Sequence, residues 1–588
     1  MGIYQKLGWF FKQHKKRYIF GIAMLMLTSL ANLVPPRILG LMADQLNKKQ
    51  ITWFSYFKYT GLILVAALSL YVLRLLWRSL IWGGATILEK ELRAKLFAHF
   101  MKMDRTFFQN NRTGDLMAHA TNDVMAVQEV AGDGILTVVD AITLGGCTAI
   151  AMILFVDLRL TLIALLPMPL LAIFARYFGD KLYVAYDKSQ AAFSKLNNKT
   201  QESVSGIKVL KTFGQAKQDT NSFNKMVDET ICINKQVFKW QSMFDPLGSL
   251  LIGLTYVIAI IYGSILVNNQ SITVGQLVSF VAYISNMVWP MFAIGYLFNI
   301  LERGSASYDR IEKLLVQKPL ITDKNADSLL NIQDLHSDLE FNIDSFAYPD
   351  DVDHNILKNI HFTLKPGQTL GLVGKVGAGK TTLIKLLLRE YDNYAGNIKF
   401  GGENIQKIPL KELLEAISYV PQKNFLFSTT IAGNIAFSNP DATMDEIQAA
   451  AKKAGLHDDI MAMPEQYETI VGEKGVSLSG GQRQRMSIAR ALLKDSRVLI
   501  LDDALSAVDA KTEGIILHNL KAEMHDKTAL IASHKLSSVM DADLILVLKH
   551  GQIVEQGVHD ELLKKKGWYA KMWERQELQS KVGENIDE

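Results

Sequence analysis

The first half of the chain contains six apolar stretches, each long enough to cross a lipid bilayer as a helix. A helix needs about 20 apolar residues to span the hydrocarbon core of a membrane. The predicted spans are Tyr18–Leu41, Tyr59–Trp82, Gly134–Val156, Leu158–Phe178, Pro246–Val267 and Gly275–Ile300. In the second half, shorter strand and helix patterns alternate instead. We therefore predict an α-helical, six-span membrane domain followed by a soluble α/β domain.

Charge and cysteine content exclude two other classes of protein. The 588 residues include 63 Lys and Arg against 59 Asp and Glu, so the charge is nearly balanced. Dedicated nucleic-acid binders usually carry a strong basic excess, and we expect no nucleic-acid partner. The two cysteines, Cys147 and Cys232, are too few for a disulfide framework, and we expect free thiols.

Basic residues predict on which side of the membrane the loops lie. Lys12, Lys15, Lys16 and Arg17 precede the first span. Lys and Arg are also frequent in the long connections after spans two and four. The positive-inside rule places these segments in the cytoplasm. Because six spans return the chain to its starting side, we expect a multi-pass protein of the plasma (inner) membrane whose soluble domain is cytoplasmic.

The two long connections are predicted to be helical extensions of the spans, since their apolar residues recur at helical spacing. Glycine interrupts this spacing at Asn110–Gly114 and Thr212–Gly214, where we expect the tips of the two hairpins. Asn32 with Pro35 and Pro36 predicts a kink in the first span.

Some ionisable side chains fall within the predicted spans, among them Arg74 and Arg78 in the second and Asp140 in the third. Charge inside a membrane is costly and usually faces a cavity or a partner group. The three residues therefore either line a substrate pathway or have internal partners, and the sequence leaves both alternatives open.

A phosphate-binding loop is predicted in the soluble half. The apolar run 368–373 predicts a buried strand, and it leads directly into GKVGAGKT at 374–381, which matches GxxxxGK[ST]. In this pattern the glycines let backbone N–H groups turn toward phosphate oxygens, the lysine reaches the β and γ phosphates, and the threonine hydroxyl ligates Mg²⁺. The predicted nucleotide-binding residues are Gly374, Gly377, Gly379, Lys380, Thr381 and, at the start of the following helix, Thr382.

Two further motifs extend this site. The apolar strand Val498–Leu501 ends in Asp502 and Asp503. We expect Asp502 to hold Mg²⁺ and the next acidic position to polarise the attacking water. A second anion-binding turn is predicted at the start of another helix, formed by Ser479, Gly480, Gly481 and Gln482. One polypeptide cannot easily wrap both turns around one γ-phosphate, whereas two chains can.

The phosphate loop, the LSGGQ turn, the Asp-terminated strand and the six preceding spans together resemble an ATP-binding-cassette (ABC) exporter half-transporter of the type IV class. The resemblance covers nearly the whole chain. It implies ATP and Mg²⁺ as cofactors, and an ATPase that drives transport through a dimer by alternating access. The hairpin tips resemble the coupling helices of this family.

The same resemblance implies roles for residues outside the main motifs. They are Tyr348, which would stack on adenine; Gln422, which would contact Mg²⁺ and water; Ser506–Asp509, which would cross to the other nucleotide domain; His534, which would contact the γ-phosphate; and Gly472–Gly475, which would lie beside the coupling helices. Ile470 replaces an acidic residue that is usual in the last of these segments.

The sequence departs from the family pattern at Asp503, where the family has a catalytic Glu. The shorter side chain places its carboxylate about 1.5 Å short, and a misplacement near 1 Å can cost about a hundredfold in rate. We therefore expect this chain's own site to bind ATP but to hydrolyse it poorly. The intact LSGGQ could complete a competent site on a different chain, as in bacterial heterodimeric multidrug exporters with one degenerate site. A homodimer in which Asp503 works adequately is the alternative.

The predicted domains are a transmembrane domain at 1–303, a connector at 304–338, an ATP-binding cassette at 339–575 and a charged, disordered tail at 576–588. We expect export of amphipathic small molecules from the lipid bilayer, with a second half-transporter as partner. The alternatives are export of a lipid or metabolite by a homodimer, and an ATP-switched regulator that transports nothing.

Overall fold

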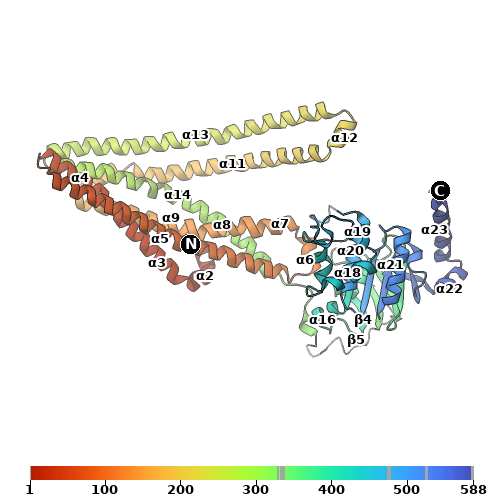
Figure 1. Cartoon of the computed structure of the whole chain (residues 1–588). Helices are drawn as coiled ribbons and strands as arrows, with labels where there is room; N and C mark the ends of the chain where they lie inside the picture. Colours follow the sequence, from red (N-terminus) through yellow and green to blue (C-terminus); the bar gives the residue numbers. More distant parts are fainter. Residues whose placement is uncertain (1, 328–329, 331–337, 473–477, 524–526, 585–588) are drawn as a thin grey trace. The chain divides into compact units, whose positions relative to one another are not determined.

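The computed structural model describes residues 2–327, 330, 338–472, 478–523 and 527–584 (Figure 1). The chain divides into two compact units. The membrane unit comprises Met1–Lys102 and Asn111–Lys318, and the soluble unit comprises Met103–Asn110 and Pro319–Glu588. The short segment Met103–Asn110 thus belongs to the soluble unit, although it lies between two membrane helices in the sequence.

Six helical stretches of the membrane unit are long and apolar enough to cross a membrane, which confirms the six predicted spans. Two short helices precede them, α1 (Gly2–Lys6) and α2 (Gly8–Gln13). The six stretches are α3 (Lys15–Ala31) with α4 (Val34–Asn47); α5 (Trp53–Phe100); α7 (Thr113–Ala118), η1 (His119–Asp123), α8 (Val124–Glu129), η2 (Val130–Gly134) and α9 (Ile135–Phe155); α10 (Leu158–Ala164) with α11 (Met168–Ser205); α13 (Ala216–Asn268); and α14 (Val274–Val316). The segments η1 and η2 are π-helical turns within the third stretch.

Two of the six stretches are interrupted next to prolines. The first breaks between α3 and α4 at Asn32 and Leu33, just before Pro35 and Pro36, so the predicted kink is confirmed. The fourth breaks between α10 and α11, where Pro167 caps α11. Proline lacks the N–H that an uninterrupted helix requires and clashes with the preceding turn, so the breaks have a local cause.

Helix α4 and the start of α14 are in close backbone contact. A Cβ atom on Gly40 would lie 2.3 Å from the carbonyl oxygen of Gly275, and one on Gly275 would lie 2.0 Å from that of Gly40. Beside these glycines, the Asp44 carboxylate accepts hydrogen bonds from the Thr273 hydroxyl and the Gly275 N–H, both at 2.7 Å. A carboxylate is favourable at a helix N-terminus. Asp44 therefore fixes the start of the sixth span to the end of the first.

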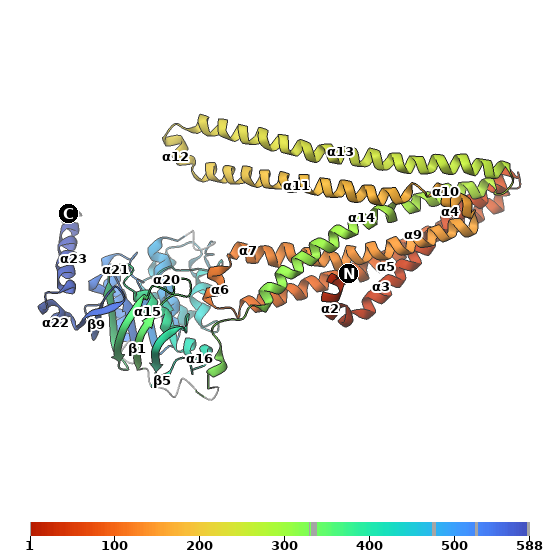
Figure 2. The same ribbon diagram turned by 180° about the vertical axis from the view of Figure 1, so that it is seen from behind.

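The second hairpin has the predicted form and the first does not. Helices α11 and α13 lie side by side, joined by α12 (Ile207–Thr212) and by Gly214 in the left-handed region at φ +67° (Figure 2). In the first connection, α5 already ends at Phe100, and a separate helix α6 (Arg105–Asn110) follows. The helix is interrupted at residues 111–112, between α6 and α7, which is within the predicted tip Asn110–Gly114, although Gly114 itself lies in the first turn of α7. The extra helix α6 starts at a side-chain cap, since Asp104 accepts the Phe107 N–H (3.1 Å).

The described residues of the soluble unit form two sheets, one of them built around the predicted phosphate-loop strand. An antiparallel sheet has the order β2-β1-β4-β5, and a six-stranded sheet has the order β10-β9-β3-β8-β7-β6. Strands β9, β3, β8, β7 and β6 pair in parallel, while β10 is antiparallel at the edge. The strands are β1 (Leu339–Phe346), β2 (Leu357–Leu364), β3 (Thr369–Gly374), β4 (Tyr394–Phe400), β5 (Glu403–Asn404), β6 (Ile417–Val420), β7 (Val498–Asp502), β8 (Thr528–Ala532), β9 (Leu544–Lys549) and β10 (Gln552–Gly557).

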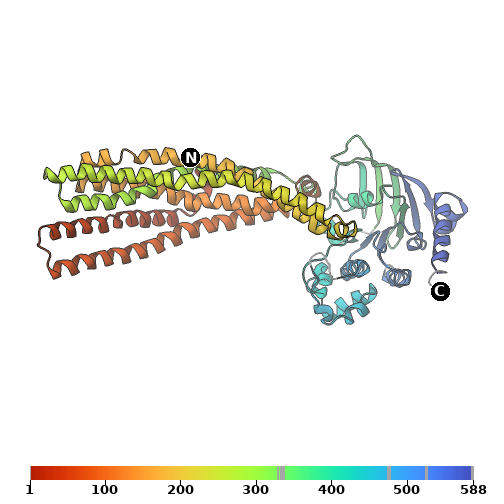
Figure 3. The same ribbon diagram turned by 90° about the horizontal axis from the view of Figure 1, so that it is seen from above.

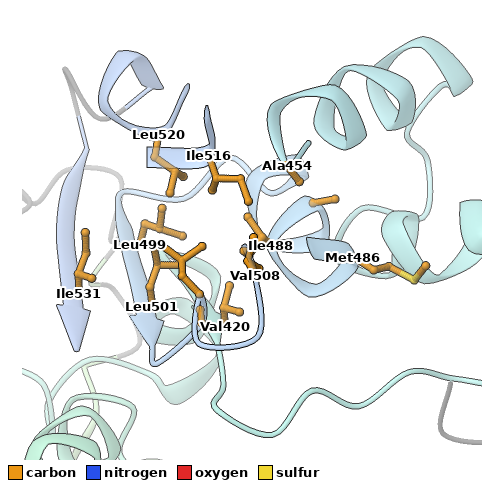
Figure 4. Close-up of a cluster of buried hydrophobic side chains, with 14 of the residues drawn as sticks. Val420, Ala454, Met486, Ile488, Leu499, Leu501, Val508, Ile516, Leu520 and Ile531 are labelled. Atoms are coloured by element: carbon orange, nitrogen blue, oxygen red, sulfur yellow. The ribbon is translucent and has the colours of Figure 1, made fainter. Parts of the chain in front are cut away.

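Helices pack around this six-stranded sheet, and those between β6 and β7 gather in one part of the unit (Figure 3). The helices are α15 (Lys380–Leu387), α16 (Leu410–Glu415), α17 (Ile431–Ile435), α18 (Met444–Lys453), α19 (His457–Met461), α20 (Gly480–Leu493), α21 (Ala510–Glu523), α22 (His559–Lys564) and α23 (Trp568–Glu584). Figure 4 shows the core that joins α20 and α21 to the sheet, where Leu499, Leu501 and Ile531 of the strands face Ile488 and Ile516 of the helices. The predicted fold, six membrane helices followed by an α/β domain, is confirmed.

Two predicted boundaries need correction. The first part of the predicted connector continues helix α14 as far as Val316, because apolar residues such as Ile311 and Leu314 still recur at helical spacing and are buried. The charged tail from residue 576 was predicted to be disordered, yet α23 extends through it to Glu584. Aromatic residues before the tail, such as the fully buried Tyr569, anchor this helix to the domain core.

Candidate nucleotide-binding site

Strand β3 places the phosphate loop at the carboxyl end of the parallel sheet, between β8 and β9. Gly374, Gly377 and Gly379 all have positive φ angles, of +150°, +79° and +105°. Two of them also lie where a side chain would collide, since a Cβ on Gly374 would lie 2.3 Å from the Leu548 carbonyl oxygen and one on Gly379 would lie 2.7 Å from the Leu357 side chain. Only glycine fits the backbone path at these positions. Helix α15 starts directly after Gly379, so the free N–H groups of its first turn border the phosphate loop.

The phosphate loop and the acidic strand end meet, as the sequence predicted. The Thr381 hydroxyl donates to Asp502 Oδ1 (3.0 Å), which brings together the two residues predicted to hold Mg²⁺. Burial raises the pKa of Asp502, and the hydrogen bond from Thr381 opposes that shift. Lys380 Nζ donates to the Gly374 carbonyl oxygen (2.9 Å). Burial lowers the pKa of Lys380, while the carboxylates of Asp503 and Asp502 act in the opposite direction.

The backbone of Asp503 is fixed on both sides of its peptide. The residue adopts a left-handed conformation at φ +50°. Its N–H donates to the Ala532 carbonyl oxygen (2.7 Å), and its own carbonyl oxygen accepts from Gln484 Nε2 (3.1 Å) and the Ser506 hydroxyl (3.0 Å). Gln422 approaches from the loop after β6, with its Nε2 3.4 Å from Asp503 Oδ2. The predicted water-polarising and Mg²⁺-contacting side chains therefore lie together, beside Asp502.

Tyr348 is half-buried against the same loop. Its hydroxyl lies 2.9 Å from the hydroxyl of Thr382, and its ring packs edge-on against Phe346 and Tyr391. Lys385 Nζ lies 5.6 Å from the ring centroid. The predicted adenine-contacting residue is thus adjacent to the first turn of α15, and adenine stacking itself stays a prediction.

The LSGGQ residues form the start of α20. The Ser479 hydroxyl accepts the Gln482 N–H (3.2 Å) and Gln482 Oε1 accepts the Ser479 N–H (3.0 Å), which is a reciprocal capping box. Gln482 Nε2 also reaches Asp459 (3.3 Å). Gly481 lies close to the Ala507 backbone, because a Cβ there would be 3.0 Å from its carbonyl oxygen. Ser479 and Gln482 are therefore bonded within the helical part of this unit rather than to the phosphate loop.

Three other features that the sequence singled out are His534, the segment Ser506–Asp509 and the segment Gly472–Gly475. His534 follows β8, whose carboxyl end lies between those of β3 and β7, so it shares the sheet edge with the phosphate loop and Asp502. In the segment Ser506–Asp509, Asp509 accepts the Thr512 N–H (2.9 Å). Of the predicted segment Gly472–Gly475, residues 473–475 lie outside the described residues.

Sequence reasoning missed Gln484, a glutamine of α20 that is only 2% exposed. Its Nε2 donates to the Asp503 carbonyl oxygen (3.1 Å) and to Ser506 (3.2 Å), and its Oε1 accepts the Ala507 N–H (2.8 Å). It thus ties the signature helix to the segment that follows the acidic strand. A buried glutamine in a helix has no periodicity of its own, so only its position soon after LSGGQ could have drawn attention to it.

The membrane unit contains a cavity of about 720 Å³ between α11 and α14. Its lining includes Asp180, Tyr183, Tyr296, Glu302 and Arg303. Arg303 is ion-paired with Glu129, and a second lining arginine, Arg310, with Asp123. The cavity therefore combines aromatic rings with carboxylates, while both of these arginines already have acidic partners.

The ionisable residues predicted within the spans lie elsewhere. Trp289 of α14 and Arg74 lie within interaction range of Asp140. Arg78 lies within electrostatic range of Asp133. The alternative of internal partners is favoured for these groups, since none of them is among the residues that line the 720 Å³ cavity.

Six membrane helices in one unit, and a phosphate loop, an acidic strand end and an LSGGQ helix in the other, define an ATP-driven membrane transporter. Models of protein families agree, since residues 18–291 match the ABC transporter transmembrane region and residues 357–506 match the ABC transporter family.

Relatives of known description cover nearly the whole chain. It is 42% identical to the probable multidrug resistance ABC transporter ATP-binding/permease protein YheI of Bacillus subtilis, over 98% of both chains. It is 40% identical to the multidrug resistance-like ATP-binding protein MdlA of Escherichia coli, over 99% of this chain and 98% of that protein. An ATP-dependent lipid A-core flippase of Syntrophus aciditrophicus is 31% identical, over 100% of this chain and 96% of that protein.

A solved structure of a bacterial Atm1-family ABC exporter with ATP bound has the same fold, with a TM-score of 0.76 at 26% identity, over 96% of this chain and 98% of that one. The chain belongs to the ABC exporter family. It is a multi-pass membrane protein, and its nucleotide domain is that of an ATPase coupled to transport.

Proposed function

We propose that this chain is one half of a heterodimeric exporter of amphipathic small molecules, and that it contributes a weakened hydrolysis site and an intact signature helix. ABC exporters act as dimers, and in this proposal the other half is a different chain with Glu at the position of Asp503. The proposal also places the exporter in the plasma (inner) membrane, with its nucleotide domain in the cytoplasm.

The observation that carries the proposal is Asp503 on a fixed backbone. The Asp503 N–H donates to the Ala532 carbonyl oxygen, and the Asp503 carbonyl oxygen accepts from Gln484 and Ser506. These bonds hold the main chain, so that it cannot shift toward the bound nucleotide. A carboxylate one methylene short therefore cannot be moved closer to an attacking water. Its nearest described polar contact, Gln422 Nε2, is already at 3.4 Å, beyond an ordinary N–H···O distance. A misplacement near 1 Å can cost about a hundredfold in rate.

The residues present fit a magnesium ion with ATP. Thr381 and Asp502 would supply oxygen ligands, since the Thr381 hydroxyl and Asp502 Oδ1 lie 3.0 Å apart. The side-chain amide of Gln422 lies beside Asp503 and could supply a further oxygen. When bound, Mg²⁺ would neutralise charge on the β and γ phosphates. The nucleotide itself would be held by Lys380 and by the N–H groups of the loop Gly374–Gly379, with Tyr348 at the adenine end.

The cargo is inferred from the cavity in the membrane unit. Tyr183 and Tyr296 offer aromatic surface, and Asp180 and Glu302 offer negative charge, while Arg303 and Arg310 are paired with other residues. This combination favours amphipathic compounds with positive charge. It agrees in kind with the multidrug descriptions of the relatives YheI and MdlA. A lipid is the second candidate cargo, on the strength of the related lipid A-core flippase.

The first test is ATPase activity of the purified full-length chain, alone and co-expressed with a second half-transporter that has Glu at the equivalent position. We expect activity only in the mixed complex, and loss of that activity when the partner's Glu is changed to Gln. Robust turnover by this chain alone would contradict the heterodimer and make Asp503 a competent residue.

The second test is Asp503→Glu in the complex whose other site has been inactivated. We expect turnover at this chain's site to rise by at least tenfold, because the added methylene restores the reach of the carboxylate. Asp503→Asn is the matched control, since Asn tolerates the same left-handed backbone but lacks the carboxylate. Equal turnover of Asp503→Glu and the parent complex would show that side-chain length does not limit this site.

A further inference from the structure

The C-terminal helix α23 is bonded to the loop that carries His534. Gln576 Nε2 donates to the His534 carbonyl oxygen (2.8 Å), and Gln576 Oε1 accepts the Leu536 N–H (2.9 Å). One side-chain amide thus pairs with two backbone groups that flank a single residue, as a neighbouring β-strand would. Both hydrogen-bonding ends of the glutamine are used, so the pairing fixes orientation as well as distance.

Helix α23 is a firm base for this contact. Tyr569 in its first turn is fully buried, and its hydroxyl lies 2.8 Å from His559 Nδ1. Trp573 packs edge-on against the His559 ring, at 4.5 Å between centroids. Met572 and Trp573 also pack on the main hydrophobic core of the soluble unit. Gln576 lies one turn after Trp573, so it is presented from a helix that the core holds in place.

The loop is also bonded to Glu513 of α21, which is 5% exposed. The Glu513 carboxylate accepts hydrogen bonds from Lys535 Nζ (2.8 Å) and from the Ser538 hydroxyl (2.5 Å). Helix α21 directly follows the segment Ser506–Asp509. The loop from His534 to Ser538 is thus bonded to α23 through its backbone and to α21 through its side chains, and the bonds from α23 are the ones next to His534.

We propose that Gln576 is a positioning residue for ATP hydrolysis: it holds the backbone of His534 so that the imidazole can reach the γ-phosphate bound at this chain's own phosphate loop. The inference rests on the proposed roles of His534 and of that site. It gives Gln576, the first residue of the predicted charged tail, a part in the reaction although it lies outside every nucleotide-binding motif.

The test uses the full-length complex in lipid nanodiscs and measures kcat and KM for ATP at this chain's site. To measure hydrolysis at this site alone, all variants also contain Asp503→Glu, and the partner's site is inactivated. If the chain proves active alone, the variants are measured in the chain without a partner. We expect Gln576→Ala to lower kcat about tenfold with the KM for ATP changed less than twofold, because the imidazole is misplaced but nucleotide contacts are kept.

Gln576→Glu keeps the acceptor for Leu536 and loses the donor to His534, so its kcat should be intermediate. Gln579→Ala, an exposed glutamine on the same helix, is the matched control and should equal the parent.

A double substitution separates positioning from general destabilisation. If Gln576 acts through His534, adding Gln576→Ala to His534→Ala should cause no further loss of kcat. An additive loss, or a Gln576→Ala variant with unchanged kcat, would overturn the proposal.

Hydrogen exchange of segment 533–538 gives a readout that needs no hydrolysis, and so separates this proposal from that of the weakened site. Exchange should be faster in Gln576→Ala than in Gln579→Ala, since the Leu536 N–H loses its acceptor. Equal exchange in the two variants would show that Gln576 does not hold the loop, whatever the activity of the site.

Discussion

At the residue scale, Gln484 links two parts of the nucleotide domain that act on different sites. In the family arrangement the LSGGQ turn serves a partner's nucleotide, whereas Asp503 serves this chain's own. Gln484 lies in the signature helix and bonds to the backbone of Asp503 and Ala507. A shift of the helix would therefore pull on Asp503, the residue proposed to polarise water.

We predict that Gln484→Ala lowers the free energy of unfolding of the soluble unit by about 1–3 kcal/mol, because it removes the hydrogen bonds to the Asp503 carbonyl oxygen and the Ala507 N–H, each worth about 0.5–1.5 kcal/mol. Thermal or urea unfolding of the purified chain measures this. Gln552→Ala changes an exposed glutamine of β10 and should stay within about 0.5 kcal/mol of the parent. Equal stability of the two variants would mean that water replaces the Gln484 amide without cost.

At the scale of elements, the short helix α6 packs with the nucleotide domain. Arg105 forms an ion pair with Glu390 at 2.6 Å, and the Tyr391 hydroxyl donates to Gln109 (3.2 Å). Phe107 is buried, and Asp104 accepts the Leu320 N–H. In the chain, α6 follows directly on the membrane helix α5. These contacts are therefore suited to carry the effect of nucleotide binding into the membrane helices.

We predict that Arg105→Glu uncouples the two activities, with transport and substrate-stimulated ATPase falling by at least fivefold while ATP binding is kept. The substitution places two carboxylates, those of residues 105 and 390, against each other, and they repel. The fold should survive, because a partly exposed ion pair such as Arg105–Glu390 stabilises a protein by only about 0.2–1 kcal/mol. The exchange Arg105→Glu with Glu390→Arg should restore most of the coupling. Failure of that double variant to recover would show that the helix docks through Phe107 and Gln109 rather than through charge.

The elements that could be predicted from the sequence are those with a local signal. Six apolar runs predict six spans, and the glycines of the phosphate loop predict its turn, because both depend on residues close together in the chain. The contact between Gln576 and His534 joins residues 42 positions apart, and helix α6 starts at an aspartate cap instead of a glycine. Neither leaves a periodic pattern. The tail was misjudged for the same reason, since the residues that anchor it precede its charged part.

At the scale of the whole molecule, the two natural cysteines report the orientation in the membrane. Cys232 is an exposed residue of α13 in the stretch before the predicted fifth span, whereas Cys147 lies in the middle of the third. If the nucleotide domain is in the cytoplasm, Cys232 must face the cytoplasm as well. Two spans separate Cys232 from that domain, and an even number of spans returns the chain to the same side of the membrane.

A membrane-impermeant maleimide should therefore label the chain in inside-out vesicles and not in intact cells. Cys232→Ser should abolish that labelling, since the reagent cannot reach Cys147 within the hydrocarbon region, while Cys147→Ser should leave it unchanged. A permeant maleimide applied to intact cells should label Cys232 and serves as the positive control. Labelling of Cys232 by the impermeant reagent in intact cells would contradict this orientation. With two spans between Cys232 and the ATP-binding domain, it would place that domain outside the cell, away from its nucleotide.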